Sequence, residues 1–276
     1  MSAVRSAARA WGVVVASSTL VAGGLLTASP AAAGTSCVPP PVAHRGDSAR
    51  APENTVPAFA KALALGVRRL ELDVRFTAGD VPVLMHDPTV DRTTNGSGDV
   101  SALTLEQLRA LDAGSWFGKG YRDVRVPTLF EVLKLAKSKG ATVMTELKTT
   151  PSPAQMTQFL DRVRWLSMGS SIIVSSFDEP TIKAVQEAAP GLRTAIIDNP
   201  RYRPPSSVLQ FGRTYVVNAR SVTEARSARW RKAGITLRPW TVDSVRGWQR
   251  MAFDRAGAIV TNRPASYLAW ARARCS

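Results

Sequence analysis

The chain has 276 residues, of which 45% are hydrophobic and 21% are charged, so it carries enough apolar side chains for a packed core. This composition excludes a chain that is disordered throughout, and the length fits one large domain or two small ones. Lysine and arginine number 36 against 21 acidic residues, a formal charge of +15. Such an excess attracts polyanions, whether nucleic acid, anionic lipid headgroups, wall phosphate polymers or small phosphates, and it singles out none of them.

The first 33 residues have the pattern of an export signal. Arg5 and Arg9 precede an apolar stretch over residues 11–27, and an Ala-Ala-Ala run ends at Ala33. A membrane anchor is the alternative, but the apolar stretch contains Ser, Thr and Gly and is shorter than the roughly 20 residues that span a bilayer. We expect cleavage after Ala33 and secretion of a single domain, residues 34–276. That domain keeps 34 basic against 21 acidic residues, a formal charge of +13.

Only two cysteines occur, Cys37 near the start of the mature chain and Cys275 one residue from its end. In an exported protein an even number of cysteines favours a disulfide over free thiols, and the termini of compact domains often lie close together. Two unpaired thiols are the alternative. The sequence therefore predicts a Cys37–Cys275 disulfide, which would restrict the unfolded chain by about 4 to 5 kcal/mol at most.

Short apolar, β-branched runs alternate with longer segments of helical spacing. The strand candidates cover residues 42–46, 69–77, 142–148, 171–177, 192–198, 214–220, 236–242 and 258–263. The helix candidates cover residues 56–65, 129–138, 154–166, 180–188, 223–233, 245–255 and 265–274, whereas residues 200–212 are Pro-rich and only weakly helical. Because strands separated by helices imply parallel crossovers, eight of them favour an α/β fold, the closed (β/α)8 TIM barrel, over an open doubly wound sheet.

One region interrupts this alternation. After the second strand come a further strand candidate over residues 81–87, a turn-rich stretch over 91–98 and a short helix candidate over 105–111. We therefore predict a small insertion, about residues 81–126, between the second strand and its helix. A long loop at this end of a barrel strand usually helps to build the active-site face.

The chain contains two histidines, His44 and His86, and each follows a strand candidate next to a charged residue. In a barrel both would face the same mouth. A satisfied core or surface residue is the usual reading of one isolated histidine, but two at strand ends favour a shared site. Because imidazole titrates near pH 6.5, two of them can divide the roles of general base and general acid.

Acidic residues accompany the histidines. Glu71 and Asp73 lie two apart on one face of a strand, and Glu146 with Lys148 repeats the spacing at the end of the third strand. Three inward acids repel one another, and a hard divalent cation with oxygen ligands, Ca²⁺ or Mg²⁺, would neutralise their charge. Salt bridges of these acids with Arg45 and Lys148 are the alternative way to neutralise it. Arg45, Lys148 and a cation in one mouth would together bind and stabilise a phosphate group, so they favour a phosphate ester as substrate.

A series of motifs, in this order, resembles the signature of the glycerophosphodiester phosphodiesterases. The motifs are His44-Arg45-Gly46, Pro52-Glu53-Asn54-Thr55, Glu71-Leu72-Asp73-Val74, His86-Asp87, Arg92-Thr93-Thr94, Pro127-Thr128-Leu129, Glu146-Leu147-Lys148, Ser176-Phe177, Trp240-Thr241-Val242 and Thr261-Asn262-Arg263-Pro264. They span essentially all of the mature chain. The resemblance implies a TIM barrel with a small insertion after the second strand, a divalent cation, and hydrolysis of glycerophosphodiesters to glycerol 3-phosphate and an alcohol.

Carried over by position, the resemblance implies specific roles. It makes His44 and His86 the acid and base pair, Glu71, Asp73 and Glu146 the metal ligands, and Arg45 and Lys148 the phosphate contacts. We assign His44 as the base and His86 as the acid, although the sequence allows the reverse. This chain departs from the family pattern at Gly79-Asp80 and at Asn262, where the family often has Asp, and we expect neither departure to touch the chemistry.

Trp240 ends the seventh strand and is expected in the wall of the same mouth, against a glycerol backbone or a choline headgroup. An ordinary core tryptophan is the alternative, and Phe177 carries the same ambiguity. Glu53 and Asn54 follow the first strand, where they would cap its helix or support the site.

Two other functions compete with this one. A phospholipase D or sphingomyelinase D of the related toxin type would use a similar barrel, but that type resembles Asp-x-Lys where this chain has Glu146-Leu147-Lys148. A non-catalytic binder of anionic wall polymer or lipid would use the basic surface, but it would have no need of both histidines and all three acids. We expect a small-molecule substrate and a monomer, without nucleic acid and without a stable membrane span.

Overall fold

The structure is a computed structural model that describes residues 37–199 and 201–275. The export signal expected over residues 1–33 lies outside the described residues. Within the described part of the chain, no helix combines the length and the apolar character needed to cross a bilayer.

The sheet confirms the predicted barrel. Its eight parallel strands are hydrogen-bonded in the order β8, β7, β6, β5, β4, β2, β1, β9. They are β1 (Pro41–His44), β2 (Arg69–Phe76), β4 (Thr142–Leu147), β5 (Ile172–Ser176), β6 (Arg193–Asp198), β7 (Thr214–Asn218), β8 (Thr236–Trp240) and β9 (Ile259–Thr261). At the remaining seam Ala258 N donates to Leu237 O (3.1 Å) and Val242 N to Val260 O (2.9 Å), so the barrel is nearly closed.

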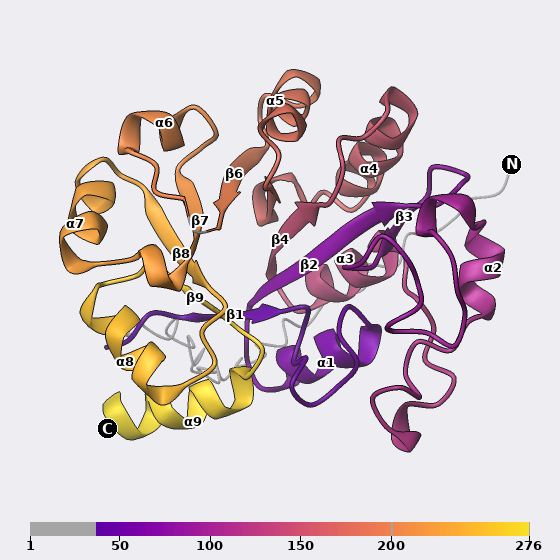
Figure 1. The fold of residues 1–276 in the computed structure, drawn as a ribbon, viewed down its shortest axis with the longest axis horizontal. Coiled ribbons are helices and arrows are strands. Elements are labelled where there is room, and N and C mark those ends of the chain that lie inside the picture. The colour runs from indigo at the N-terminus through magenta and orange to yellow at the C-terminus, as the bar shows by residue number, and fades with distance from the viewer. Residues whose placement is uncertain (1–36, 200, 276) are drawn as a thin grey trace, which may run out of the picture. The chain divides into compact units, whose positions relative to one another are not determined.

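Helices pack around the strands (Figure 1). They are α1 (Val56–Ala64), α3 (Leu129–Ser138), α4 (Pro153–Trp165), α5 (Glu179–Ala188), α6 (Pro205–Leu209), α7 (Glu224–Lys232), α8 (Val245–Phe253) and α9 (Pro264–Cys275). Thr128 and Ser152 begin α3 and α4 with capping boxes that satisfy the first free backbone donors of each helix. The Pro-rich stretch forms only the five-residue α6, which begins at Pro205 after the N-cap residue Pro204 and ends at Leu209.

Between β2 and α3 the chain adds four short elements. They are β3 (Pro82–Leu84), the 3₁₀ turn η1 (Val100–Ala102), α2 (Leu105–Ala110) and the 3₁₀ turn η2 (Lys119–Tyr121). β3 turns back and pairs antiparallel with β2, with Val74 opposite Leu84. The segment has its own small core, in which Val83, Val90 and Leu108 are fully buried. Its strand β3 ends just before His86.

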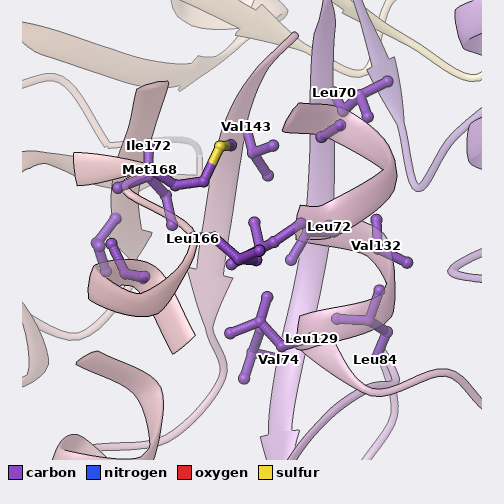
Figure 2. Packing of buried hydrophobic residues seen from close by; sticks show 14 of the residues in the cluster. Leu70, Leu72, Val74, Leu84, Leu129, Val132, Val143, Leu166, Met168 and Ile172 are labelled. Atoms are coloured by element: carbon purple, nitrogen blue, oxygen red, sulfur yellow. The ribbon is translucent and has the colours of Figure 1, made fainter. Parts of the chain in front are cut away.

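The side chains of each strand alternate between two environments. On β2, Leu70, Leu72 and Val74 face outward and pack against α3 and its neighbours, as Figure 2 shows. Glu71 and Asp73 therefore face the barrel interior. The apolar part of that interior is a smaller layer that includes Met144, Ile173, Ala195, Val216 and Val260.

The two ends of the domain are joined covalently. Cys37 and Cys275 form the predicted disulfide, with their Cα atoms 5.8 Å apart across a sequence separation of 238. The bond ties the segment before β1 to the last residue of α9.

Candidate active site

A cavity of about 100 Å³ opens at the carboxyl ends of the strands. Seven of its lining residues were predicted from the sequence as site residues: His44, Arg45, Glu71, His86, Glu146, Lys148 and Trp240. Asp73 lies beneath them and is fully buried. The structure therefore brings all eight predicted active-site residues to one mouth.

Glu71, Asp73 and Glu146 converge because their strands are adjacent and their positions share the inner face. Asp73 is in register with Glu146 across the β2–β4 pair. One carboxylate oxygen from each of the three acids lies within 4.8 Å of the others, and all three are buried. Burial and the neighbouring charges of Asp73 and Glu146 raise the pKa of Glu71 well above its usual range. Burial and Asp73 likewise raise the pKa of Glu146 to about 7.

Two cations balance part of this charge, so the salt bridges weighed as an alternative are present. Arg45 Nε lies 3.0 Å from Asp73 Oδ2. Lys148 Nζ lies 2.6 Å from Glu146 Oε1 and 3.3 Å from Asp73 Oδ1. Glu71 pairs with neither cation at this range, and its carboxylate accepts the backbone N–H of Arg45 (3.1 Å). Three acids against two cations leave the cluster with one uncompensated carboxylate.

The acid cluster has the chemistry of a divalent cation site. Asp73 Oδ1 is buried and accepts no hydrogen bond, and the three acids offer only oxygen donors. Hard cations such as Ca²⁺ and Mg²⁺ prefer such ligands. Glu71, Asp73 and Glu146 could therefore hold one divalent cation, which would relieve the mutual repulsion that raises the pKa of Glu71.

The loop between β1 and α1 supports this cluster through residues that the sequence ranked lower. Asn54 Nδ2 donates to Asp73 Oδ2 (2.7 Å), and Asn54 Oδ1 accepts the backbone N–H of Asp73. Asn54 and Arg45 both adopt positive φ, near 57° and 55°. Thr55, not Glu53 or Asn54, occupies the cap position of α1, so the capping role considered for those two residues is wrong and the supporting role is found.

His44 lies at the end of a polar chain that starts on another strand. Its Nδ1 is 2.6 Å from Asn262 Oδ1, and Asn262 Nδ2 donates to Asp243 Oδ2 (2.6 Å). The expectation that Asn262 does not touch the chemistry is therefore wrong. Asn262 and Asp243 follow β9 and β8, and only the closure of the barrel brings them to His44.

This chain of contacts fixes the tautomer of His44. Both oxygens of Asp243 act as acceptors, so the amide nitrogen of Asn262 faces Asp243 and the amide oxygen faces His44. Nδ1 of His44 must then carry the proton. Its Nε2, 3.9 Å from Glu71 Oε2, is left with a free lone pair on the cavity side.

His86 has a charged partner instead. Its Nδ1 lies 2.6 Å from Asp87 Oδ1, and Arg92 Nε donates to Asp87 Oδ2 (2.6 Å). Arg92 also forms a two-point pair with Glu53, which in turn accepts from Arg45 Nη1 (2.9 Å). The hydrogen bond from Arg92, with that from His86, lowers the pKa of Asp87 to about 2, so Asp87 is ionised and Nδ1 of His86 is a donor.

Both imidazoles are poorer bases than free histidine. Burial, with the charge of Arg45 next, lowers the pKa of His44 to about 4. Burial also lowers the pKa of His86, while the charge of Asp73 and the hydrogen bond to Asp87 oppose that shift. Sequence reasoning missed Asp87, Arg92, Asn262 and Asp243 as supporting residues, although the quoted motifs contain the first three and Asp243 directly follows Trp240-Thr241-Val242.

An aromatic wall closes the opposite side of the mouth. The rings of Trp240 and Phe177 meet edge to face with centroids 5.5 Å apart. Phe177 is exposed, and Trp240 Nε1 is buried without a hydrogen-bond partner. Trp240 thus belongs to the lining of the mouth, as predicted.

A parallel barrel with acids, histidines and cations at the carboxyl ends of its strands defines an enzyme of phosphate ester chemistry. Residues 44–266 match the glycerophosphoryl diester phosphodiesterase family, and the chain belongs to that family. It is accordingly a phosphodiesterase that hydrolyses glycerophosphodiesters.

Individual relatives agree with this result. A glycerophosphodiester phosphodiesterase of Caldanaerobacter subterraneus subsp. tengcongensis is 34% identical over 227 residues, 81% of this chain and 93% of that protein. The structure of a glycerophosphodiester phosphodiesterase from Agrobacterium tumefaciens superposes with a TM-score of 0.76 at 29% identity, covering 84% of this chain and 99% of that one. An Oleispira antarctica phosphodiesterase in complex with its product sn-glycerol-3-phosphate shares the fold, with a TM-score of 0.77 at 22% identity over 84% and 96% of the two chains.

Proposed function

We propose that this enzyme hydrolyses glycerophosphodiesters to glycerol 3-phosphate and an alcohol, with His44 as general base and His86 as general acid. The observation that carries the proposal is the different partner of each histidine: a neutral amide, Asn262, at His44 and an ionised carboxylate, Asp87, at His86. A phosphodiester breaks when an attacking hydroxyl loses a proton and the leaving alkoxide gains one, so the site needs both groups.

His44 suits the role of base. Its Nδ1 is committed to Asn262, and its pKa of about 4 keeps the ring neutral near pH 7, so Nε2 can accept a proton from the attacking hydroxyl. Asn262 and Asp243 then hold the ring in one orientation while the proton arrives.

His86 suits the role of acid. A carboxylate hydrogen-bonded to Nδ1 stabilises an imidazolium, which an amide does less well, so Asp87 counteracts part of the lowering of the His86 pKa that burial causes. Arg92 holds Asp87 in place from its other side. The Nε2–H of the imidazolium is then available to the leaving oxygen.

Charge on the phosphate would be met by Arg45 and Lys148, whose side chains already lie among the acids at the cavity floor. We assign Glu71, Asp73 and Glu146 as ligands of one divalent cation, Ca²⁺ or Mg²⁺. When bound, such a cation neutralises the phosphate oxygens and orients the ester. A cation held by these acids would compete with Lys148 and Arg45 for the same carboxylates, which would leave both side chains available to the phosphate.

The aromatic wall and the disulfide support two further parts of the proposal. Trp240 and Phe177 offer an apolar surface for the glycerol backbone or a choline headgroup. The Cys37–Cys275 disulfide fits an oxidising compartment, in line with the export signal expected over residues 1–33. We therefore place the enzyme outside the cytoplasm.

One assay tests the reaction directly. Purified protein is given glycerophosphocholine, glycerophosphoethanolamine, glycerophosphoglycerol and a lysophospholipid, each with Ca²⁺, with Mg²⁺ and with excess chelator. We expect release of glycerol 3-phosphate from the first three only when a cation is present. Full activity in chelator would contradict the cation site, and turnover of the lysophospholipid alone would favour a phospholipase D.

A further inference from the structure

A second group of cations lies at the opposite end of the barrel, away from the catalytic mouth. Arg238 is in β8 between Leu237, which packs outward, and Pro239, and it shares the inner face of its strand with Trp240. It is in register with Val216, and its Nη1 reaches across the interior to Met144 Sδ (3.7 Å) on β4. Val216 and Met144 both belong to the apolar inner layer. A guanidinium therefore lies inside the barrel among apolar side chains.

No acidic group among the described residues pairs with this guanidinium. None of the described salt bridges includes Arg238, and its Nε is buried without a hydrogen-bond partner. A charged group held against apolar side chains without an ionic partner is destabilising, because it loses water without gaining a counter-charge. A residue of this kind is unfavourable in the fold unless something supplies the missing negative charge.

Two more arginines increase the imbalance. Arg69 begins β2 and shares the inner face with Glu71, and Arg193 begins β6 and shares it with Ala195. In addition to burial, the charges of Arg69 and Arg193 lower the pKa of Arg238 to about 10. Arg193 is exposed and Arg69 half-buried. All three side chains thus belong to the amino-terminal part of the inner face, where Arg238 is half-buried with a buried Nε and Arg193 Nη2 donates to Ser170 O (2.6 Å) at the surface.

We propose that Arg69, Arg193 and Arg238 form a second binding site, separate from the catalytic mouth, for the phosphate group of a small anion. The guanidinium edge formed by Nε and one Nη matches two oxygens of a phosphate, and Nε of Arg238 is unpartnered on that edge. The wider charge distribution favours the same ligand, since residues 200–276 contain 15 lysines and arginines against three acids.

Arginine-resolved NMR tests the site on the mature protein. The Nε–Hε resonances are followed during titration with inorganic phosphate, with glycerol 3-phosphate, and with chloride at equal ionic strength. Arg238 reports the proposed site and Arg45 reports the mouth, so a failure at one is distinguishable from a failure at the other. We expect a saturable shift of the Arg238 resonance with phosphate that chloride does not reproduce.

The two phosphate arms identify the source of the ligand. A response to both compounds supports a site that recognises the phosphate group whether it is free or esterified. A response only to inorganic phosphate supports the same site with no room for the glycerol of the ester. An Arg238 resonance that responds to phosphate and chloride alike, or to neither, would overturn the proposal, because the site would then have no preference for a phosphate group.

Thermal unfolding supplies a second readout. Arg238→Met should raise Tm in chloride buffer, because it removes an unpaired charge, and should lose part of the increase in Tm that phosphate gives the wild type. Arg246→Met, an exposed arginine of α8, is the matched control and should keep the whole increase. Arg238→Lys keeps the positive charge but loses the pair of parallel N–H donors of a guanidinium. This variant should therefore fold, and phosphate should raise its Tm less than it raises that of the wild type. Equal increases in all four proteins would contradict the proposal.

Discussion

At His44 and His86 the hydrogen-bond partner of Nδ1 decides what Nε2 can do. Asn262 accepts from His44 without adding charge, while Asp87 brings a full negative charge to His86. The two rings can therefore have different protonation states in one cavity. This difference is the physical basis for the division of labour proposed above.

Asn262 should consequently behave as a positioning residue. Asn262→Ala removes the acceptor of His44 Nδ1–H, frees the ring to rotate and lowers the pKa of His44 further. We expect kcat to fall by about 10- to 100-fold, and the acid limb of the pH–rate profile to move to lower pH. Ser48→Ala is the control, because Ser48 donates to Asn262 Oδ1 but does not touch the imidazole. An unchanged pH profile with the rate loss would indicate a merely structural role for Asn262.

The raised pKa of Glu146 should make both the stability of the fold and its affinity for a cation depend on pH. Its pKa of about 7 in the fold exceeds the usual 4.5, so the folded chain binds this proton more tightly than the unfolded chain does. In chelator, stability should fall as pH rises from about 4.5 to about 7, since the fold loses the proton that it favours. A cation binds the ionised acids, so its apparent affinity should rise as the pH increases through about 7, where Glu146 loses its proton.

Two experiments measure these pH dependences. Urea unfolding in chelator at several pH values gives the free energy of unfolding, and calorimetric titration with Ca²⁺ or Mg²⁺ at the same pH values gives the cation affinity. Glu146→Gln should flatten both, because the amide does not titrate and is a weaker ligand. A cation affinity independent of pH between about 5.5 and 8 would contradict the ligand assignment.

The residues that line the mouth were easier to predict from the sequence than the residues that position them through hydrogen bonds. His44, Glu71 and Glu146 could be found because strand alternation and a shared barrel end place them together. Asn262 could not be linked to His44, since 218 residues separate them and only the closed barrel joins them. Glu53 and Arg92 are likewise 39 residues apart, and their pairing depends on the path of the inserted segment.

Among the elements, the strands were predicted to within a few residues. Strands of a parallel barrel are buried on both faces, so they stand out in the sequence as short apolar runs. β2, for example, was expected over 69–77 and is found over Arg69–Phe76. A strand was expected over 81–87 and is found over Pro82–Leu84, but its antiparallel pairing with β2 was not predicted, because a short apolar run carries no information about direction. In the short α6 the prolines account for one end only: Pro204 and Pro205 fix where the helix begins, and Gly212, with φ near +127°, follows its last turn.

The turn between β1 and α1 gives a prediction at this scale. Gly46 has φ near +86°, and a Cβ there would lie 2.6 Å from the backbone carbon of Ala58. Gly46→Ala should therefore cost about 2 to 5 kcal/mol of stability, from strain and clash together. Gly66 has almost the same φ but open space around it, so Gly66→Ala should cost only about 1 to 2 kcal/mol. Chemical unfolding of both variants checks the difference, and equal costs would show that the close approach at Ala58 is unimportant.

For the whole molecule, the disulfide closes nearly all of the described chain into one loop. In the chain-entropy view this restricts the unfolded state by about 5 kcal/mol at most. Replacing Cys37 and Cys275 together by Ser should lower Tm while leaving kcat nearly unchanged, because the bond lies at the termini and not at the mouth. Thiol titration of the wild type should find no free thiol before reduction and two after it. Two reactive thiols in the native protein would contradict the pairing.

The division of roles between the histidines is tested most directly by a change of leaving group. His44→Ala and His86→Ala should each lower kcat on glycerophosphocholine by roughly 10² to 10⁴ with the fold intact. A nitrophenyl ester of glycerol phosphate, whose leaving group needs no proton, should restore much of the rate of His86→Ala and little of that of His44→Ala. Near wild-type turnover of glycerophosphocholine by both variants, or equal rescue of both by the nitrophenyl ester, would contradict the assignment of His44 as base and His86 as acid.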